Sequence, residues 1–340
     1  MATLVLAPNL DVLSLEAVLV QAFKKTVSSI RSHNWFADTL ELDTATVDYP
    51  TFIASLTDDL SNFRRWRSKR LRLVPAPKSG PWWINEKSQW EPKPDEGDDE
   101  SAVKLRPLAH VPLRDQVIAT AMMMCLADRI ETIQGDPRLD VRDPKNRKRV
   151  VSHGNRLFCD AFDRRSKTTL RHRWGSSRVY RSYFSDYRNF IARPEIVASA
   201  MGERTDLQTV IVHSDLSKFY DRVRPPMLHA KLQQHLQPDE KSFYAFARRA
   251  LDWKWHSDDA QLATDISGID DFERVALPQG LVASGFFANV TLLDFDQALR
   301  DAFDTEIDDG LVLRDAAPGR LRDDRAAGID RLRQLGLWRG

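Results

Sequence analysis

Asp215 comes three residues after a short run of apolar and β-branched residues at positions 209–212. Such a run predicts a buried strand, and a carboxylate at the end of a strand is well placed to hold a divalent metal. Mg²⁺ prefers hard oxygen ligands and commonly takes one or two carboxylates together with substrate phosphates. Tyr220, five residues after Asp215, could pack under the sugar of a bound nucleotide. The local pattern favours equally a simpler role for Asp215, in which its carboxylate caps the turn before a helix.

The elements that would position these residues are mostly helical. Apolar residues that recur at intervals of three and four predict amphipathic helices, and the Pro-Pro pair at 225–226 suits the start of a helix. The Pro-Gln-Gly sequence at 278–280 predicts a turn. Met122, Met123 and Met124 are expected to fill the core rather than to bind a cofactor. Helices are expected at residues 14–35, 49–66, 117–130, 225–237 and 283–303.

The composition is typical of a soluble protein with a sizeable core, since 42% of its 340 residues are hydrophobic and 29% are charged. This length suggests two or three domains. No stretch approaches the roughly 18 apolar residues of a membrane span, and the first residues lack the features of a signal peptide. Cys125 and Cys159, the only cysteines, favour a reducing cytoplasm and exclude a disulfide scaffold or a multi-cysteine zinc site. We expect both to be small buried hydrophobic side chains.

Charge is distributed unevenly along the chain, although the net charge is only +1. Residues 91–100 hold six acids against one lysine, which together with their Pro and Gly content predicts an exposed linker. Residues 138–193 hold 16 Lys and Arg against five Asp, a surplus of 16 − 5 = 11. Aromatic residues are interleaved with this basic run. The pattern favours contact with nucleic acid, in which arginines hold phosphates and aromatics stack on bases, over a solvated basic surface.

Two segments of the second half resemble motifs of bacterial reverse transcriptases. The sequence Asp-Leu-Ser-Lys-Phe-Tyr-Asp at 215–221 resembles motif A. The sequence Leu-Pro-Gln-Gly at 277–280, followed by Ser284 and by Ala-Asn at 288–289, resembles motif B, in which a Pro-Gln-Gly turn leads into a helix.

Two further segments occur upstream in the order that this family requires. Arg-Pro-Leu-Ala-His-Val-Pro at 106–112, with Asp115 and Ala121, resembles the segment that opens the fingers of group II intron reverse transcriptases. Ser-His-Gly-Asn-Arg at 152–156 resembles the Ser-Tyr-Gly-x-Arg segment that follows, with His153 where tyrosine is usual. The long arginine-rich and aromatic-rich insertion after it is similar to that of abortive-infection, anti-phage reverse transcriptases.

The resemblance implies an α+β fold with the right-hand architecture of polymerases. An N-terminal helical region with an acidic linker is expected at 1–103, fingers at 104–205 and a palm at 206–340, with the thumb missing. The resemblance also implies roles for single residues. Asp215 would bind both catalytic metals, and Leu216 would offer a backbone carbonyl to the nucleotide-bound metal. Tyr220 would be the gate against a ribose 2′-hydroxyl, and Arg156 would grip the triphosphate. Gln279 and Gly280 would shape the pocket under the nascent base pair.

Other roles remain open for some of these residues. Arg156 could instead pair with an acidic side chain of the protein, and the helix after 277–280 could be ordinary core. Asp221 matches no metal ligand of the family, so we expect it to be structural.

The family completes its metal site with a third motif, an aromatic residue and one variable residue before Asp-Asp. Asp323 and Asp324 are the preferred match, with Leu321 in place of the aromatic, and 308–309 is the alternative pair. Neither the apolar strand that should follow nor a thumb is recognisable after residue 324. We therefore expect a C-terminally truncated chain, with a missing domain or an oligomer to complete it.

The function expected from the resemblance is RNA-directed DNA synthesis by two-metal nucleotidyl transfer, with anti-phage defence as the expected setting. Such an enzyme would use two Mg²⁺ ions, with Mn²⁺ as an alternative, together with dNTPs, an RNA template and a DNA primer, and no membrane. Two alternatives stand beside it. One is a non-catalytic remnant that only binds nucleic acid, and the other is a polymerase that makes RNA or adds nucleotides without a template.

Overall fold

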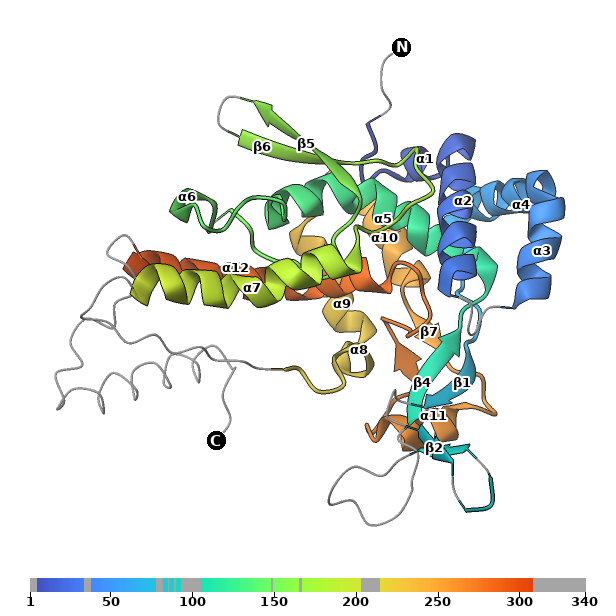
Figure 1. Ribbon diagram of the computed structural model, residues 1–340. Helices are drawn as coiled ribbons and strands as arrows, with labels where there is room; N and C mark the ends of the chain where they lie inside the picture. The colour runs from blue at the N-terminus through green and yellow to red at the C-terminus, as the bar shows by residue number, and fades with distance from the viewer. Residues whose placement is uncertain are drawn as a thin grey trace.

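The computed structural model describes residues 5–33, 38–77, 82–84, 86–88, 90–92, 105–147, 149–164, 167–202 and 215–307. Within these ranges the chain combines many helices with small antiparallel sheets, so the expected α+β class is confirmed (Figure 1). Several predicted features lie outside the described residues, namely the strand at 209–212, most of the acidic linker, and both candidate Asp-Asp pairs at 308–309 and 323–324.

The helix α5, Leu113–Gln134, runs through the middle of the hydrophobic core, and 17 of its 22 residues are buried. It is longer than the predicted 117–130 because it begins directly after Pro112 and ends at Gly135, whose φ of 79° suits a helix terminus. Met122, Met123 and Met124 are at most 1% exposed, which confirms their expected place in the core. The N-terminal helix α2, Glu16–His33, packs along α5.

The N-terminal region is helical as far as residue 65. It contains α1 (Leu10–Leu13), α2, α3 (Thr39–Val47), α4 (Tyr49–Ser61) and the 3₁₀ turn η1 (Phe63–Arg65). The predicted helix at 14–35 corresponds to α2, whereas the one predicted at 49–66 ends earlier, at Ser61, and continues only as η1. Trp66 then turns inward and is 2% exposed, with the Arg114 guanidinium 3.4 Å from the centre of its ring.

The strands of the described residues form two-stranded antiparallel sheets. They pair β1 (Arg72–Pro77) with β4 (Leu105–His110), β2 (Trp82–Ile84) with β3 (Trp90–Pro92), β5 (Cys159–Arg164) with β6 (Lys167–His172), and β7 (Trp253–Lys254) with β8 (Arg274–Val275). In the first pair Arg72 lies opposite His110, so the strands join residues on both sides of the expected boundary at 103 and 104. One cluster of buried hydrophobic residues likewise extends from Leu6 to Leu293.

The second half is again mainly helical. It contains α6 (Pro144–Arg147), α7 (Tyr183–Gly202), α8 (Phe219–Arg222), α9 (Pro225–Gln234), α10 (Lys241–Ala250), α11 (Ala260–Ser267) and α12 (Ser284–Ile307). The predictions at 225–237 and 283–303 are confirmed by α9 and α12. Leu228 and Leu232 of α9 are fully buried, as their spacing of four residues predicts.

Both cysteines are buried and unpaired, as expected. Among the described residues, none of the helices has the length and apolar character needed to cross a membrane.

Asp115, in the first turn of α5, connects three parts of the fold. Its Oδ2 accepts hydrogen bonds from the Lys69 backbone N–H at 2.8 Å and from the Trp253 indole N–H at 3.2 Å. Its Oδ1 accepts one from the Arg114 guanidinium at 3.1 Å. Burial nevertheless raises the pKa of this carboxyl to about 6, against the lowering effect of those donors. Burial therefore outweighs the donors at this site.

We expect Asp115 to make stability depend on pH. Because its pKa is raised in the folded state from an ordinary value near 3.8, the folded protein binds more protons between pH 4 and pH 6. Its contribution is therefore fully present below about pH 3.8 and is lost as pH rises through about 6, a change on the order of 2–3 kcal/mol. Urea unfolding at a series of pH values measures it, and Asp115→Asn should remove this part of the profile.

Asp239→Asn is the matched control, since this carboxyl is exposed between α9 and α10. Parallel pH profiles for wild type and Asp115→Asn would contradict the assignment.

Candidate nucleotide site

The Gln279 backbone lies beside strand β4. Leu108 forms a parallel bridge with Gln279, and the Ala109 N–H donates to the Gln279 carbonyl at 2.8 Å. The Arg-Pro-Leu segment at 106–108 and the Pro-Gln-Gly turn at 278–280, far apart in the sequence, are thus neighbours in the fold.

The Pro-Gln-Gly turn is held from the other side by Gln116 of α5. The Gln116 amide donates to the Gly280 carbonyl at 2.7 Å and accepts from the Val282 N–H at 2.8 Å. Gly280 has a φ of 140°, a region that side chains with a Cβ rarely enter. The shape of this turn therefore depends on a glycine and on one buried amide, which is 2% exposed.

The turn at 152–156 docks on the first half of α12. The Asn289 side chain donates to the carbonyls of Gly154, at 2.8 Å, and Asn155, at 3.3 Å. One turn earlier in the helix, a Cβ on Gly285 would lie only 2.8 Å from Cγ of Asn155. The two segments are in direct contact here, and only a glycine leaves room for it.

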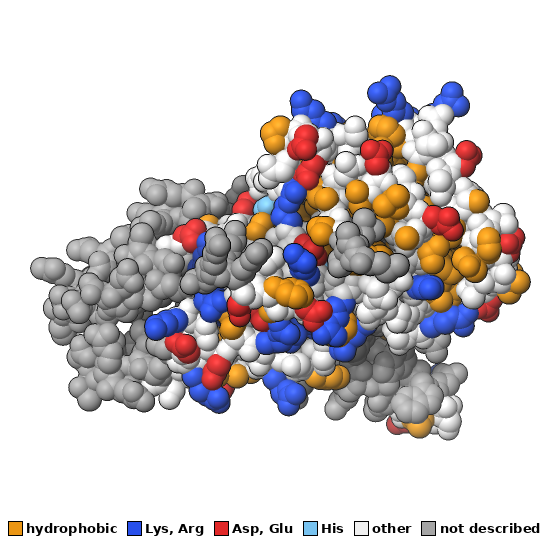
Figure 2. All heavy atoms as spheres, turned by 90° about the horizontal axis from the view of Figure 1, so that it is seen from above, with side chains coloured by type: hydrophobic (Ala, Val, Ile, Leu, Met, Phe, Trp, Pro, Cys, Tyr) orange, Lys and Arg blue, Asp and Glu red, His pale blue; other side chains and the backbone are white. Residues whose placement is uncertain are grey.

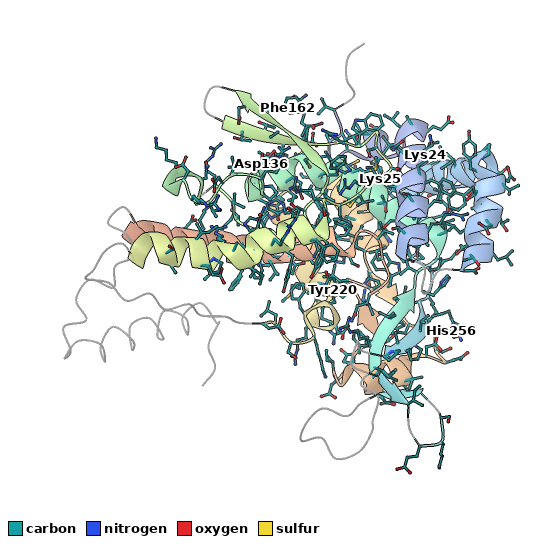
Figure 3. All side chains as sticks on the ribbon, in the orientation of Figure 1. Lys24, Lys25, Asp136, Phe162, Tyr220 and His256 are labelled. Carbon is teal, nitrogen blue, oxygen red and sulfur yellow. The ribbon has the colours of Figure 1, made fainter. Side chains whose placement is uncertain are left out.

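The segment 215–221 is anchored to the same region through its second half. Asp221, 7% exposed, accepts a hydrogen bond from the Gln279 side chain at 2.8 Å. This is the structural role expected for Asp221. Tyr220, on the short helix α8 (Figure 3), has its hydroxyl 3.5 Å from Nδ2 of Asn155. Burial raises the pKa of Tyr220, and the Asn155 amide opposes this.

The start of this segment is open to solvent. Asp215 is exposed and Leu216 is 53% exposed, so both are accessible to a ligand. Lys218, with a φ of 54°, turns the chain into α8, and its ammonium donates to the Ser267 carbonyl at 2.6 Å. The lysine is therefore engaged with the end of α11.

Tyr180 connects the segment that follows the Pro-Gln-Gly turn with the start of α12. Its hydroxyl donates to the Val282 carbonyl at 2.7 Å and accepts from the Phe286 N–H at 3.3 Å. Burial raises the pKa of this phenol well above its ordinary value. At neutral pH Tyr180 is therefore uncharged, and its hydroxyl holds these two backbone segments together.

Arg156 is placed differently from the expectation that it grips a triphosphate. Its side chain is buried beside Glu131, with Nε donating to the carboxylate at 2.9 Å and both side chains at most 1% exposed. The remaining donors of the guanidinium reach the carbonyls of Ser152, Glu131 and Gly135. In this arrangement no donor is turned toward solvent, so the alternative role, pairing with an acid of the protein, describes its contacts.

The environment of this pair is unusual for a charged group. Burial raises the pKa of Glu131, and Arg156 and the Leu157 N–H lower it. His153 is 5% exposed, and burial together with neighbouring arginines lowers its pKa to about 4. At neutral pH the imidazole is therefore uncharged and adds nothing to the positive charge of this turn.

Much of the basic surplus at 138–193 is used within the fold. Arg181 pairs with Asp186 at 3.0 Å and Arg138 with Asp136 at 2.8 Å. The guanidiniums of Arg173 and Arg178 lie 4.6 and 4.9 Å from the centre of the Phe158 ring. On the face shown in Figure 2, Lys and Arg side chains alternate with Asp, Glu and hydrophobic ones. The described part of that face thus presents no continuous basic surface.

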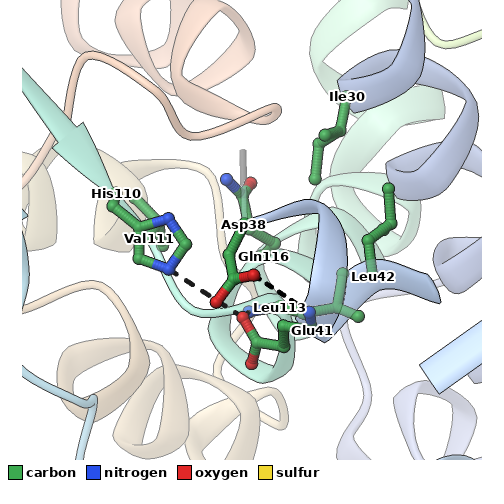
Figure 4. A pocket seen from close by; sticks show the side chains of 8 residues that line it. All are labelled: Ile30, Asp38, Glu41, Leu42, His110, Val111, Leu113 and Gln116. Atoms are coloured by element: carbon green, nitrogen blue, oxygen red, sulfur yellow. Dashed lines mark hydrogen bonds and ion pairs between the residues drawn. The ribbon is translucent and has the colours of Figure 1, made fainter. Parts of the chain in front are cut away.

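The described residues contain one group of three potential metal ligands, Asp38, Glu41 and His110 (Figure 4). Their ligand atoms lie within 4.8 Å of one another beside a pocket of about 20 Å³, the space of one water molecule. An imidazole with two carboxylates suits a transition metal better than Mg²⁺.

Both carboxylates of this group already have structural partners. Asp38 caps α3 by accepting from the N–H groups of Leu40 and Glu41, each at 3.0 Å. Glu41 accepts from the Leu113 N–H at the start of α5, at 3.2 Å. The positive ends of two helices therefore account for these acids and oppose a cation between them. Of the predicted metal ligands only Asp215 belongs to the described residues, and it is not part of this group.

The sequence did not predict the hydrogen bonds that Gln116 and Asn155 make in the candidate site. Gln116 directly precedes a long apolar stretch, and a buried amide usually hydrogen-bonds a distant segment. Asn155 lies in the turn at 152–156. Its φ of 47° belongs to the left-handed region that asparagine tolerates better than most residues.

No protein-family model matches the chain, and no curated protein matches its sequence. The contacts among the four segments are therefore the observations on which an assignment of function has to rest.

We expect Arg156→Met to act on stability. Leaving Glu131 buried without its partner should lower the free energy of unfolding by about 3–5 kcal/mol. In the double variant Arg156→Met with Glu131→Gln no unpaired charge remains, so part of this loss should be recovered. Urea denaturation of the two single variants and the double variant measures the coupling.

Normal stability of Arg156→Met would contradict the buried pair. Additional weakening of nucleotide binding in that variant would then favour the triphosphate role expected from the sequence.

Proposed function

We propose that this chain is a template-copying nucleotidyltransferase of the reverse-transcriptase kind, an RNA-directed DNA polymerase. One observation carries the proposal: the four segments that resemble motifs of that family contact one another. Gln279 meets strand β4 and Asp221, and Asn289 meets the turn at 152–156, which in turn reaches Tyr220.

Chance resemblance of four short segments gives no reason for them to be neighbours. Asp221 and Gln279 are 58 positions apart, and Asn289 and Gly154 are 135 apart. A shared site explains both the order of the segments in the sequence and their proximity in space. This is the support for a polymerase hand with fingers and palm, which we propose as the architecture within the α+β class.

The oxygen donors available at Asp215 and Leu216 fit Mg²⁺. The exposed Asp215 carboxylate and the Leu216 carbonyl are the hard oxygen ligands that this ion prefers. We assign the remaining carboxylates to Asp323 and Asp324. When bound, two such ions lower the barrier to an in-line displacement by neutralising charge on the attacking and leaving oxygens.

The residues around this position would select and orient the nucleotide. Tyr220 is half-buried and held in place, which suits a rigid wall against a ribose 2′-hydroxyl and favours dNTPs as substrates. Gln279 and Gly280 form a fixed turn beside it, which suits a surface under a base pair. An RNA template and a DNA primer are the proposed partners, and anti-phage defence in the cytoplasm is the proposed setting.

Primer extension tests the proposal. The chain is given an RNA template, a DNA primer, dNTPs and Mg²⁺, with Asp215→Ala measured alongside. We expect extension by wild type and a loss of at least about a hundredfold in the variant, because the metals lose the carboxylate that they share. Asp239→Ala, which removes an exposed carboxylate between α9 and α10, is the matched control and should retain full activity.

The other outcomes separate the alternatives. Equal binding of RNA by wild type and Asp215→Ala, with no extension by either, would overturn the polymerase and leave a binding protein. Extension with ribonucleotides, or products unrelated to the template sequence, would point to RNA synthesis or untemplated addition.

A further inference from the structure

Asn155 holds the hydroxyl of Tyr220. In the described residues the only side-chain hydrogen bond to this hydroxyl comes from Nδ2 of Asn155, at 3.5 Å. Tyr180, a neighbouring phenol, uses its own hydroxyl on the Val282 carbonyl and the Phe286 N–H. The orientation of the Tyr220 ring therefore depends on Asn155 at its polar end and on hydrophobic packing elsewhere.

The position of Asn155 is itself tightly specified. Its backbone has a φ of 47°, and its carbonyl accepts a hydrogen bond from Asn289 at 3.3 Å. Its side chain lies against Gly285, where an added Cβ would come within 2.8 Å of Cγ and 3.0 Å of Oδ1. Helix α12 therefore packs against the Asn155 side chain, whose Nδ2 donates to the Tyr220 hydroxyl.

We propose that Asn155 is a positioning residue that determines how strictly Tyr220 excludes ribonucleotides. The inference rests on the proposed function, because it assigns Tyr220 to the nucleotide sugar. A steric gate works only if its ring stays in place when a larger sugar presses against it. The Asn155 amide restrains the hydroxyl end of the Tyr220 ring. Gly285, which has no Cβ, leaves the space that the amide occupies.

Asn155→Gly is the direct test. Glycine accepts the positive φ and leaves the carbonyl that Asn289 contacts, so the variant removes only the amide side chain. We expect the ratio of kcat/KM for a dNTP to that for the matching rNTP to fall roughly two- to tenfold, as for one lost hydrogen bond. The change should come mainly from better use of the ribonucleotide. Asp271→Gly, at another residue of positive φ (57°), is the matched control and should leave the ratio unchanged.

Two further variants distinguish positioning from a general structural role. Asn155→Asp keeps the size of the side chain and can accept the phenolic proton, so it should preserve the ratio. Tyr220→Phe removes the hydroxyl, so adding Asn155→Gly to it should change nothing more. An unchanged ratio in Asn155→Gly, or an equal fall in both backgrounds, would overturn the inference while primer extension itself stands.

Gly285→Ala, in helix α12, tests the position of the Asn155 side chain independently. The added methyl group should displace the Asn155 side chain and lower the same ratio, although alanine suits a helix better than glycine. When residue 155 is already glycine, the added methyl group has no amide side chain to displace, so Gly285→Ala should then have no effect on selectivity. An effect that persists in that background would contradict the proposed contact.

Nucleotide binding separates this inference from the proposed function. If the chain does not extend primers, titration calorimetry with dATP and ATP in Mg²⁺ measures sugar preference directly. A preference for dATP that Asn155→Gly reduces would sustain the inference and overturn the polymerase. If neither nucleotide binds, or if the preference is the same in wild type and Asn155→Gly, the inference is wrong.

Discussion

Helix α5 lies almost entirely within the core, and three of the polar side chains that it carries there have partners in distant segments, whereas the buried amide of Gln134 has none among the described residues. An unpaired buried donor or acceptor costs about 1–3 kcal/mol. Asp115 therefore binds the Lys69 N–H, Gln116 binds the Pro-Gln-Gly turn, and Glu131 binds Arg156. Each of these bonds joins a different part of the chain to one helix. The arrangement of the candidate site depends on this requirement, because two of the three partners belong to it.

The same requirement places basic side chains inside the fold, both in α2 and in the region at 138–193. Lys25 of α2 is buried, and its ammonium donates to the carbonyls of Arg173, Ser176 and Arg178, so a cation holds the loop before α7 in place. Burial lowers the pKa of this lysine to about 8. Arg156 is used in a similar way. A surplus of positive charge in the sequence thus contributes to internal cohesion as well as to any surface for phosphates.

The candidate site owes its coherence to short polar contacts between segments rather than to a deep cavity. Backbone groups of 152–156 and 278–282 are held by side chains of α5 and α12, which fixes the turns. Asp215, at the start of the segment that carries Tyr220 and Asp221, is exposed. The candidate site therefore combines turns held by buried hydrogen bonds with an accessible carboxylate.

The sequence by itself determined the elements whose signals are local. Hydrophobic spacing predicted α2, α9 and α12, and the apolar run that includes Met122 predicted the buried centre of α5, because periodicity depends only on nearby residues. Tertiary structure alone decided the partner of each long polar side chain. Arg156 could have met a phosphate or an acid, and the choice fell on Glu131, 25 positions away, whose burial only the folded core establishes. Likewise, no local pattern predicts the contact between Asn155 and Tyr220. That contact depends on the packing of the turn at 152–156 against α12, which only the folded chain establishes.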